Sequence, residues 1–276
     1  MRVVAILATF NEARFIAGCI EHLRSQGVDV YLIDNESTDD TVAIAERYVG
    51  SGVIGIETLA RSSASDLDLR LTRKEELALK LEADWLMHLD ADEFHVAAQP
   101  RRSLAQAFAE AEDAGFNAIN FIEYTFVPTR EHPNHDHPKF AQTMRSYYPY
   151  LPSFPHRLNA WKRQERRVEL AWMAGHQVRF EGIRMAPRNL VMRHYLFLSV
   201  EHAVEKYIVS GGFAEKGVDR GWHDWRPRLQ AELISLPSES ELRRYVSDEL
   251  LDRSEPRKRH ILADAALHAV NERRPA

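Results

Sequence analysis

Three carboxylates follow a short apolar run in the segment ADWLMHLDADEFH, residues 83–95. The run from Trp85 to Leu89 has the length of a buried strand, and Asp90, Asp92 and Glu93 come directly after it. Two aspartates one residue apart can both reach one divalent cation, and their hard oxygen ligands suit Mg²⁺ or Mn²⁺. An isolated Asp-x-Asp is more often a solvated turn, but its position at the end of a buried strand favours a metal site that handles substrate phosphates.

Polar residues follow two other apolar runs in the same way. Thr9, Asn11 and Glu12 come after residues 3–8, and Asp34 comes after residues 28–33. Ligands of open α/β sheets bind beyond the carboxyl ends of the parallel strands. We therefore expect these side chains to share one edge of a sheet with the acidic segment.

The elements that must position these residues alternate along the first half of the chain. Helical patterns separate the strands, and Ser37-Thr38-Asp39-Asp40 has the chemistry of a helix start. This order predicts an α/β fold with a Rossmann-like, mostly parallel sheet flanked by helices. The second half predicts a long loop over 128–156, short strands over 157–193, and helices over 199–216 and 238–272. Strands are predicted over residues 3–8, 28–33, 53–59, 85–89 and 118–126, and helices around 15–23, 42–49, 71–81 and 104–111.

Composition excludes several classes of protein. The 276 residues carry a mixed net charge of −5, which does not indicate a nucleic-acid partner, and the lone Cys19 excludes an intrachain disulfide and is compatible with the cytoplasm. No apolar run is long enough to span a membrane, and the first run is too short for a signal peptide. The loop ATFNEARF, residues 8–15, has no glycine, so the P-loop, the dinucleotide fingerprint and the glycine-rich loop of a nucleotidyltransferase are absent.

Three motifs in order resemble family 2-type glycosyltransferases of the GT-A fold. They are ILATFNEARFIAGCIEHL, VYLIDNESTDDTVAIAERY and ADWLMHLDADEF, and GHQVRFEG, RHYLFLSVEHAVEKY and GWHDWR resemble a bacterial subgroup of that family. The resemblance implies a GT-A domain over 1–198, with a nucleotide-binding part over 1–127 and an acceptor-side part over 128–198. A helical C-terminal extension would follow over 199–276.

The resemblance also implies roles for the residues at the strand ends. Asp34 would accept a hydrogen bond from a base N–H, Asp90 would approach the ribose or the metal, and Asp92 would bind the metal directly. Arg73 or Lys74, of which we take Arg73, would contact the diphosphate. Turn, cap and solvated-helix roles are the structural alternatives for Asp34, Ser37 and Arg73. The expected nucleotide contacts are Thr9, Asn11, Glu12, Asp34, Ser37, Arg73 and Asp90, and the expected metal ligands are Asp90, Asp92 and His194.

His194, in RHYLF, is the candidate for a metal contact from the C-terminal half. A neutral imidazole is a good ligand, although a histidine hydrogen-bonded in the core is an equal alternative. His223 in GWHDWR is a rival, and Tyr195 and Lys206 could support the same site or simply pack.

The base that would deprotonate the acceptor is harder to assign. The Glu-Asp pair common in the family is missing at the expected distance, so we take His176 of AGHQ as the base and keep Glu169 and Asp136 as alternatives. A structural histidine beside a glycine turn is the competing role for His176. The cluster His132, His135, Asp136 and His137 is predicted to face the acceptor rather than to bind zinc.

The resemblance implies a metal-dependent, inverting glycosyltransferase of bacterial surface-glycan synthesis. A nucleoside-diphosphate sugar, with UDP as the expected nucleotide, would be the donor, and a glycan or lipid-linked hydroxyl the acceptor. The C-terminal basic residues, Arg253 to Arg259 and Arg273-Arg274, suit either a solvated helix face or contact with the inner face of the membrane. A non-catalytic sugar-nucleotide or glycan-binding protein on the same scaffold is the alternative function.

Overall fold

The computed structural model describes residues 1–61, 66–97, 99–210 and 225–272. Contacts group the chain into two units. Unit 1 contains the described residues of Met1–Ser62, Leu67–Glu123 and Phe154–His194, and unit 2 contains those of Ser63–Asp66, Tyr124–Ser153 and Tyr195–Ala276. The segment from residue 124 to 153 thus groups with the C-terminal residues, whereas the sequence suggested a division after residue 198.

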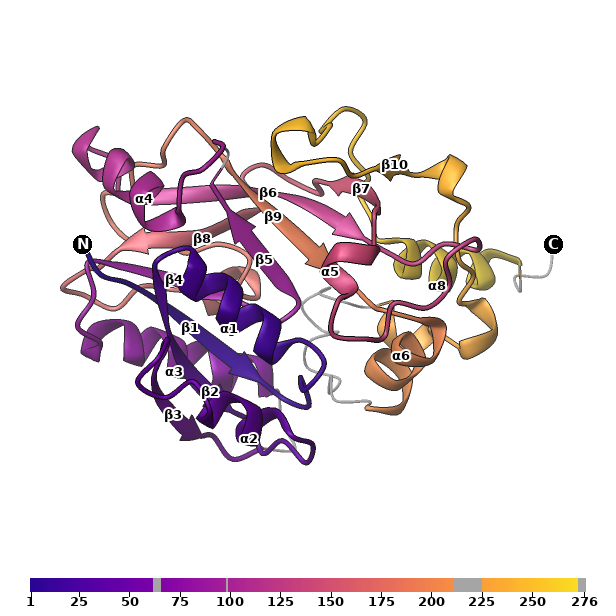
Figure 1. The fold of residues 1–276 in the computed structure, drawn as a ribbon, viewed down its shortest axis with the longest axis horizontal. Coiled ribbons are helices and arrows are strands. Elements are labelled where there is room, and N and C mark those ends of the chain that lie inside the picture. The colour runs from indigo at the N-terminus through magenta and orange to yellow at the C-terminus, as the bar shows by residue number, and fades with distance from the viewer. Residues whose placement is uncertain (62–65, 98, 211–224, 273–276) are drawn as a thin grey trace. The chain divides into compact units, whose positions relative to one another are not determined.

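Four parallel strands form the first half of the sheet in unit 1 (Figure 1). The apolar runs of β1 and β4 are buried on both faces of the sheet, as parallel strands covered by helices on both sides must be, whereas β3 at the sheet edge is mostly half-buried or exposed. Every residue of β1 is buried. The strands are β1 (Val3–Thr9), β2 (Val28–Asp34), β3 (Val53–Thr58) and β4 (Trp85–Leu89).

Antiparallel strands complete the sheet of unit 1. The order is β6-β8-β4-β1-β2-β3, and β5 pairs with β9. The α/β prediction with a helix-flanked sheet is confirmed, but β5 directly after β4 and the pairing of β8 beside β4 were not predicted. These strands are β5 (Glu93–Val96), β6 (Ala118–Phe126), β8 (Arg157–Lys162) and β9 (Leu190–Tyr195).

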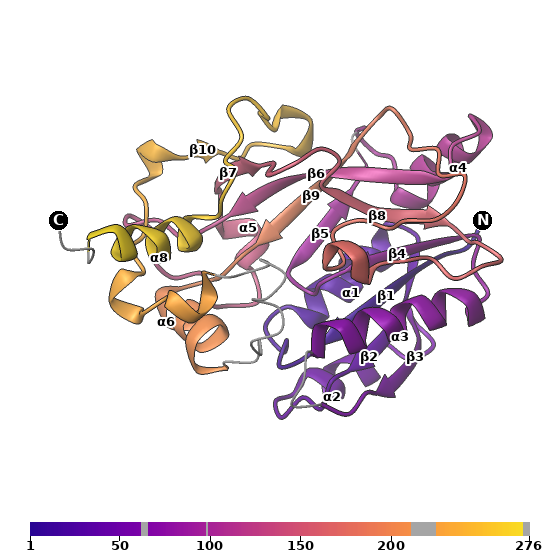
Figure 2. The same cartoon turned by 180° about the vertical axis from the view of Figure 1, so that it is seen from behind.

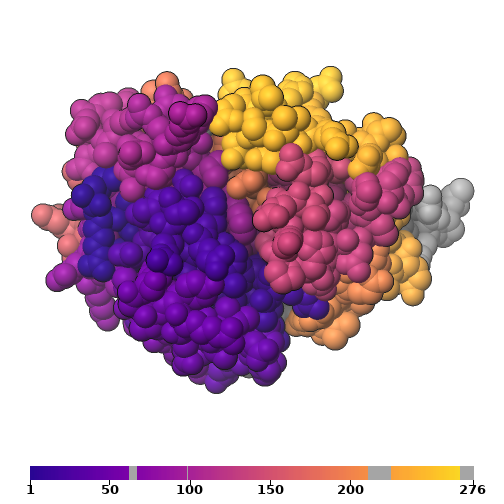
Figure 3. All heavy atoms as spheres, viewed as in Figure 1, coloured from indigo at the N-terminus to yellow at the C-terminus, as the bar shows by residue number. Residues whose placement is uncertain are grey.

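Helices cover both faces of this sheet. Helices α1 (Ile16–Ser25) and α4 (Leu104–Asp113) lie on one face and α3 (Asp66–Lys80) on the other, as the two opposite views show (Figures 1 and 2). A capping box of Ser103 and Gln106 starts α4. The short α2 (Thr41–Glu46) follows β2, and in the space-filling view atoms of the N-terminal part of the chain form much of the visible surface of unit 1 (Figure 3).

Unit 2 is less regular, and two predictions for it were wrong. The segment 128–156 is not only a loop, because it contains α5 (Phe140–Thr143) and β7 (Ser146–Tyr150). The segment 238–272 is helical only in short 3-10 turns and in α8 (Ile261–Glu272), and β10 (Arg243–Arg244) pairs with β7. Helix α6 (Val200–Val204) continues as a π-helix over Glu205–Val209, and the rest of the predicted 199–216 helix lies outside the described residues.

An apolar cluster of its own holds unit 2 together. Phe197, Ala203, Leu262 and Ala266 are fully buried or nearly so within this cluster, and α8 contacts the 3-10 turns at Arg226–Arg228 and Ala231–Leu233. Among the described residues, no helix has both the length and the hydropathy needed to cross a bilayer.

Candidate active site

The acidic segment forms the turn between β4 and β5. The N–H of Asp90 donates to Oε2 of Glu93 over 3.2 Å, and the N–H of Glu93 donates to the carbonyl of Asp90 over 3.1 Å. Asp90 is exposed, whereas Asp92 and Glu93 are buried. The carboxylates therefore follow a buried strand as predicted, but they differ in their access to water.

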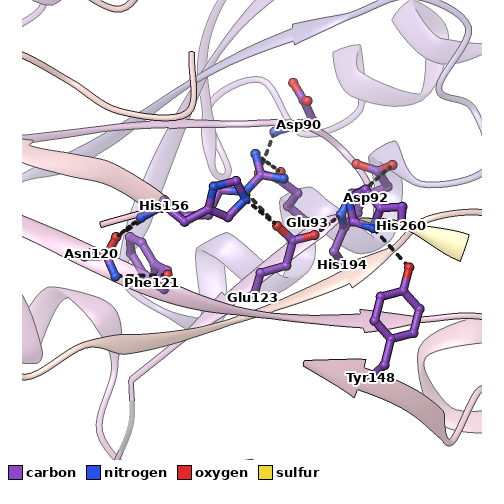
Figure 4. A network of polar contacts seen from close by, with 11 residues as sticks. Asp90, Asp92, Glu93, Asn120, Phe121, Glu123, Tyr148, His156, His194 and His260 are labelled. Carbon is purple, nitrogen blue, oxygen red and sulfur yellow. Dashed lines mark hydrogen bonds and ion pairs between the residues drawn. The ribbon is translucent and has the colours of Figure 1, made fainter. Parts of the chain in front are cut away.

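His194 lies beside Asp92. It is opposite Glu93 in the register of β5 and β9, and its Nε2 is 3.4 Å from Oδ2 of Asp92. Burial by itself would lower the pKa of His194, but the carboxylates of Asp92 and Glu123 raise that pKa well above its ordinary value. The structure thus brings together Asp92 and His194, two of the three predicted metal ligands (Figure 4).

A buried network of charges lies behind this pair. Glu123 of β6 accepts from Nδ1 of His194 over 2.7 Å and from Nε of Arg157 over 2.8 Å. The guanidinium of Arg157 also lies 3.4 Å from Oε1 of Glu93. Burial raises the pKa of Glu93 to about 7, with Arg157 opposing the shift and Asp90 adding to it. Carboxylates and cations alternate through this network, which is how buried charges are tolerated.

Two oxygen atoms without partners lie at the ends of β1 and β2. Thr9 and Asp34 are register partners, and both side chains are buried, with exposures of 1% and 3%. Oδ2 of Asp34 accepts from the N–H of Ser37 over 3.0 Å, but Oδ1 of Asp34 and Oγ1 of Thr9 have no partner among the described residues. Buried polar atoms are normally hydrogen-bonded, so this pair is suited to a donor supplied by a ligand.

The loop after β1 is fixed against the loop after β2. The N–H of Asn11 donates to Oγ of Ser37 over 3.0 Å, and the N–H of Glu12 donates to Oγ1 of Thr41 over 2.8 Å. Asn11 has a φ of 55°, a left-handed conformation that asparagine tolerates better than most residues. The structure therefore brings Thr9, Asn11, Glu12, Asp34 and Ser37 to one edge of unit 1, as the sequence predicted.

Arg73 is not part of this group, because its guanidinium is bound elsewhere. It donates to both oxygens of Glu57, over 2.7 and 2.8 Å, and to Glu76 over 2.8 Å. The neighbouring Lys74 is buried and donates to the carbonyl of Leu89, directly before the acidic turn, over 3.3 Å. Burial lowers the pKa of Lys74 to about 8, although Asp90 opposes the shift. Of the two sequence candidates, Lys74 is thus the one beside the acidic segment.

His176 lies at the end of a tight turn in unit 1. Gly175 has a φ of 82°, and a Cβ there would lie 2.6 Å from Nε2 of His88, so this position requires glycine. The ring of His176 contacts the ring of His156 edge to face, with 5.1 Å between their centroids, and Nε2 of His156 is 3.3 Å from Glu123. The candidate base is therefore connected to the buried network through His156.

The other candidates for the base or the metal have different surroundings. The carboxylate of Glu169 is paired with Arg179. His135 and His137 of unit 2 both contact the hydroxyl of Thr143, at 2.9 and 3.3 Å. Asp136 is exposed. Lys206 donates to the carbonyl of Leu196, and Tyr195 packs against Phe126 and Phe140. The remaining candidates, His223, Arg273 and Arg274, lie outside the described residues.

Comparison with known proteins identifies the family. Residues 4–167 match the sequence model of Glycosyl transferase family 2. The chain belongs to this family. It is similar to an uncharacterized glycosyltransferase of Rickettsia felis, with 27% identity over 74% of this chain and 66% of the relative, and to one of Rickettsia conorii, with 25% identity over the same shares. The chain thus spans slightly less than two thirds of the length of these relatives.

Solved structures show only a distant likeness to this family 2 member. The structure of S. aureus TarS residues 1–349 in complex with UDP-GlcNAc has 14% identity and a TM-score of 0.42, covering 75% of this chain and 62% of that one. Glucosyl-3-phosphoglycerate synthase of Mycobacterium tuberculosis, in complex with Mn²⁺, UDP and its product, has 16% identity and a TM-score of 0.28, covering 44% of each chain.

Sequence reasoning missed the residues that surround the site of this family 2 member. Glu123 stands alone in the apolar strand AINFIEYTF, and a single carboxylate in a buried strand is the signal that could have identified it. His156 directly precedes β8 and Arg157 is its first residue, and neither carried a comparable signal. Their contacts with Glu123 join β6 to β8, and such pairings are invisible before the topology is known.

Proposed function

We propose that this chain is a metal-dependent, inverting glycosyltransferase that moves a sugar from a nucleoside-diphosphate donor to a hydroxyl acceptor. The observation that carries the proposal is the 3.4 Å approach of Asp92 and His194. Asp92 follows β4, at the same edge of the parallel strands as the oxygens of Thr9 and Asp34 that have no partner among the described residues, and His194 of β9 lies beside Asp92. One ligand that carries both phosphates and a base would use both features.

The nucleotide would be recognised at the ends of β1 and β2. Oδ1 of Asp34 would accept a base N–H, for which the imide of uracil is suited, so a UDP-sugar is the expected donor. The loop with Asn11, Glu12 and Ser37 would line the ribose, and Asp90 would lie near the ribose or the metal. Arg73 would need to leave Glu57 to reach a diphosphate, whereas Lys74 already lies beside the acidic turn.

The donor atoms present fit a divalent cation. Asp92 and His194 supply a carboxylate oxygen and an imidazole nitrogen, a set that Mn²⁺ accepts and that Mg²⁺ accepts less readily because it prefers oxygen. Asp90 would complete the protein's ligands. When bound, the cation would neutralise the negative charge of the departing nucleoside diphosphate.

The acceptor hydroxyl requires a base, and we assign this role to His176. An imidazole at this position could take the hydroxyl proton while the acceptor attacks the anomeric carbon from the face opposite the leaving group. We place the acceptor in bacterial surface-glycan synthesis, with the enzyme in the cytoplasm at the inner face of the membrane. Exposed basic residues such as Arg253 and Arg259 support contact with anionic lipid.

Calorimetric titration with UDP, GDP, CDP and dTDP, each with and without Mn²⁺, tests the site. We expect one nucleotide to bind only with the metal and only while Asp92 is intact. Incubation with the corresponding nucleotide sugar should then release the nucleoside diphosphate. Binding without any turnover, in the presence of varied glycan and lipid acceptors, would favour the non-catalytic binding protein instead, and no binding at all would reject the proposed site.

A further inference from the structure

Glu123 occupies an unusual position in the middle of β6. Its neighbours in the strand are apolar or uncharged, and the residue is completely buried. An ionised carboxylate without partners would cost several kcal/mol at such a place. The side chain is therefore retained only because its contacts compensate for the lost hydration.

Each oxygen of Glu123 has its own partners. Oε1 accepts from Nδ1 of His194 over 2.7 Å, while Oε2 accepts from Nε of Arg157 over 2.8 Å and lies 3.3 Å from Nε2 of His156 (Figure 4). Arg157 is always charged, so it holds Oε2 and keeps the carboxylate ionised. Rotation of the carboxylate is thereby blocked, and Oε1 stays directed at His194.

This arrangement determines which ring nitrogen of His194 is free of hydrogen and can therefore bind a metal ion. An ionised carboxylate can only accept a hydrogen bond, so Nδ1 must carry the hydrogen. The other nitrogen, Nε2, faces Asp92 over 3.4 Å. A carboxylate behind a histidine in this way fixes the tautomer and orientation of the ring and strengthens it as a metal ligand.

We propose that Glu123 is a positioning residue that orients His194 toward the cation, with Arg157 holding the carboxylate in place. The inference rests on the proposed function, because it assumes that Asp92 and His194 hold a divalent cation. It assigns a role to a residue outside the proposed ligand set of Asp90, Asp92 and His194.

The variant Glu123→Gln tests this role. An amide has a single acceptor oxygen, which the charged Arg157 would take, and the amide nitrogen would then face Nδ1 of His194. The tautomer with hydrogen on Nε2 would be favoured, and that nitrogen could no longer bind a metal. We expect the dissociation constant for Mn²⁺, measured by calorimetry without nucleotide, to rise roughly 10- to 100-fold.

Glu112→Gln is the matched control. This carboxylate also accepts from a cation and a neutral donor, Lys162 over 2.7 Å and Nε1 of Trp85 over 2.8 Å, but it lies beside the start of β4 instead of its end. The same chemical change there should leave the Mn²⁺ dissociation constant within about twofold of the wild-type value, since no group near the metal site is altered.

A second measurement separates orientation from general damage to the fold. Zn²⁺ is diamagnetic and binds carboxylate and imidazole ligands, so ring ¹⁵N spectra can be recorded with this ion. The wild type should show the hydrogen of His194 on Nδ1, and Glu123→Gln should lose that signal. If Glu123→Gln does not fold, Glu123→Asp serves instead, because it keeps the charge but withdraws the carboxylate by one methylene.

The outcomes distinguish the inference from the proposed function. Loss of Mn²⁺ binding in His194→Ala, with wild-type affinity and the wild-type ring signal in Glu123→Gln, would overturn the role of Glu123 alone. If the wild type binds no Mn²⁺, or if His194→Ala binds it as well as the wild type, the metal site itself is rejected and the inference with it.

Discussion

The parallel and antiparallel strands of unit 1 bury different kinds of side chain. Residues 3–7 of β1 and 85–87 of β4 are aliphatic or aromatic and have an exposure of 1% or less, and the buried ionisable exceptions in the parallel strands are His88 of β4 and Asp34 at the end of β2. The antiparallel strands β5, β6, β8 and β9 bury ionisable side chains to the same degree. These are Glu93, His95, Glu123, Arg157 and His194, all with an exposure of 9% or less.

The aliphatic side chains of the first group and the buried charges of the second therefore contribute to stability in different ways. Apolar burial stabilises by about 25 cal/mol per Å² removed from water, whereas a buried charge must recover its lost hydration from its partners. Well-packed apolar residues often replace a buried ion network without loss of stability. We infer that the apolar residues of the parallel strands stabilise the fold. The buried charges of the antiparallel strands lower that stability in part, and they hold reactive groups in place.

The largest expected effect is the loss of transfer in Asp92→Asn. The change removes a charged ligand while keeping the shape of the side chain, so we expect activity to fall at least about 1,000-fold, or roughly 4 kcal/mol. The thermal unfolding midpoint should stay within a few degrees of the wild type, because asparagine keeps the shape of the side chain and His194 keeps its hydrogen bond to Glu123. Initial rates of nucleotide release give the first quantity and calorimetry the second. Full activity in this variant would reject a functional role for the acidic segment.

The opposite result is expected for Ile6→Ala in β1. Ile6 is fully buried, and truncation of an aliphatic core side chain costs about 3 kcal/mol through lost transfer energy and the cavity that remains. The activity of the folded fraction should be unchanged, since Ile6 contacts no predicted ligand. Urea denaturation measures the free energy of unfolding, and active-site titration normalises the rate. A specific activity reduced tenfold in the folded protein would contradict the separation of the two regions.

The difference between the parallel and the antiparallel strands also explains which parts of the fold and the site could be predicted from the sequence. The five strands at residues 3–8, 28–33, 53–59, 85–89 and 118–126 were found because apolar runs are local signals, and Thr9, Asp34 and Asp92 follow from them. The network around Glu123 depends on the pairing of β6 with β8 and on His194 lying near Asp92, contacts that span 34 to 102 residues of chain. Such distant pairings leave no local pattern, and the short elements of 238–260 gave a helical pattern that tertiary contacts overrode.

Asp34→Asn tests the polar end of the parallel strands. The amide can place its oxygen toward the N–H of Ser37, but its NH₂ would then replace the unpartnered Oδ1 and face the donor of a base. We expect nucleotide affinity to fall roughly 10- to 30-fold, or about 2 kcal/mol, with the Mn²⁺ affinity unchanged. Calorimetry with UDP and with Mn²⁺ separately measures both. Unchanged UDP affinity would leave Asp34 as a residue that only fixes the turn after β2.

The variant His95→Leu tests whether a buried polar side chain of the antiparallel strands can be replaced without loss of stability. Within the part of the chain that the structure describes, neither ring nitrogen of His95 has a hydrogen-bond partner, and the ring packs edge-on against Phe121 with a centroid distance of 4.5 Å. Replacement by an apolar side chain of similar size removes two unsatisfied groups, so we expect a gain of about 1 kcal/mol in the free energy of unfolding at pH 7. Urea denaturation again gives the value.

The pH dependence of this variant gives a sharper test than its stability at neutral pH. Burial, aided by His22 and Arg157, lowers the pKa of His95 to about 3. As the pH falls below 6.5, His95 is protonated in the unfolded chain, whereas in the folded chain it stays neutral until about pH 3. The free energy of unfolding of the wild type therefore decreases over this pH range. The difference in the free energy of unfolding between His95→Leu and the wild type should therefore grow, in favour of the variant, by up to about 1.4 kcal/mol per pH unit below pH 6. The exposed His132, replaced by Leu, should show no such gain. If the free energy of unfolding changes with pH in the same way in the wild type and in His95→Leu, His95 has a hydrogen-bond partner in solution. This residue would then belong to the buried polar network of the antiparallel strands as well.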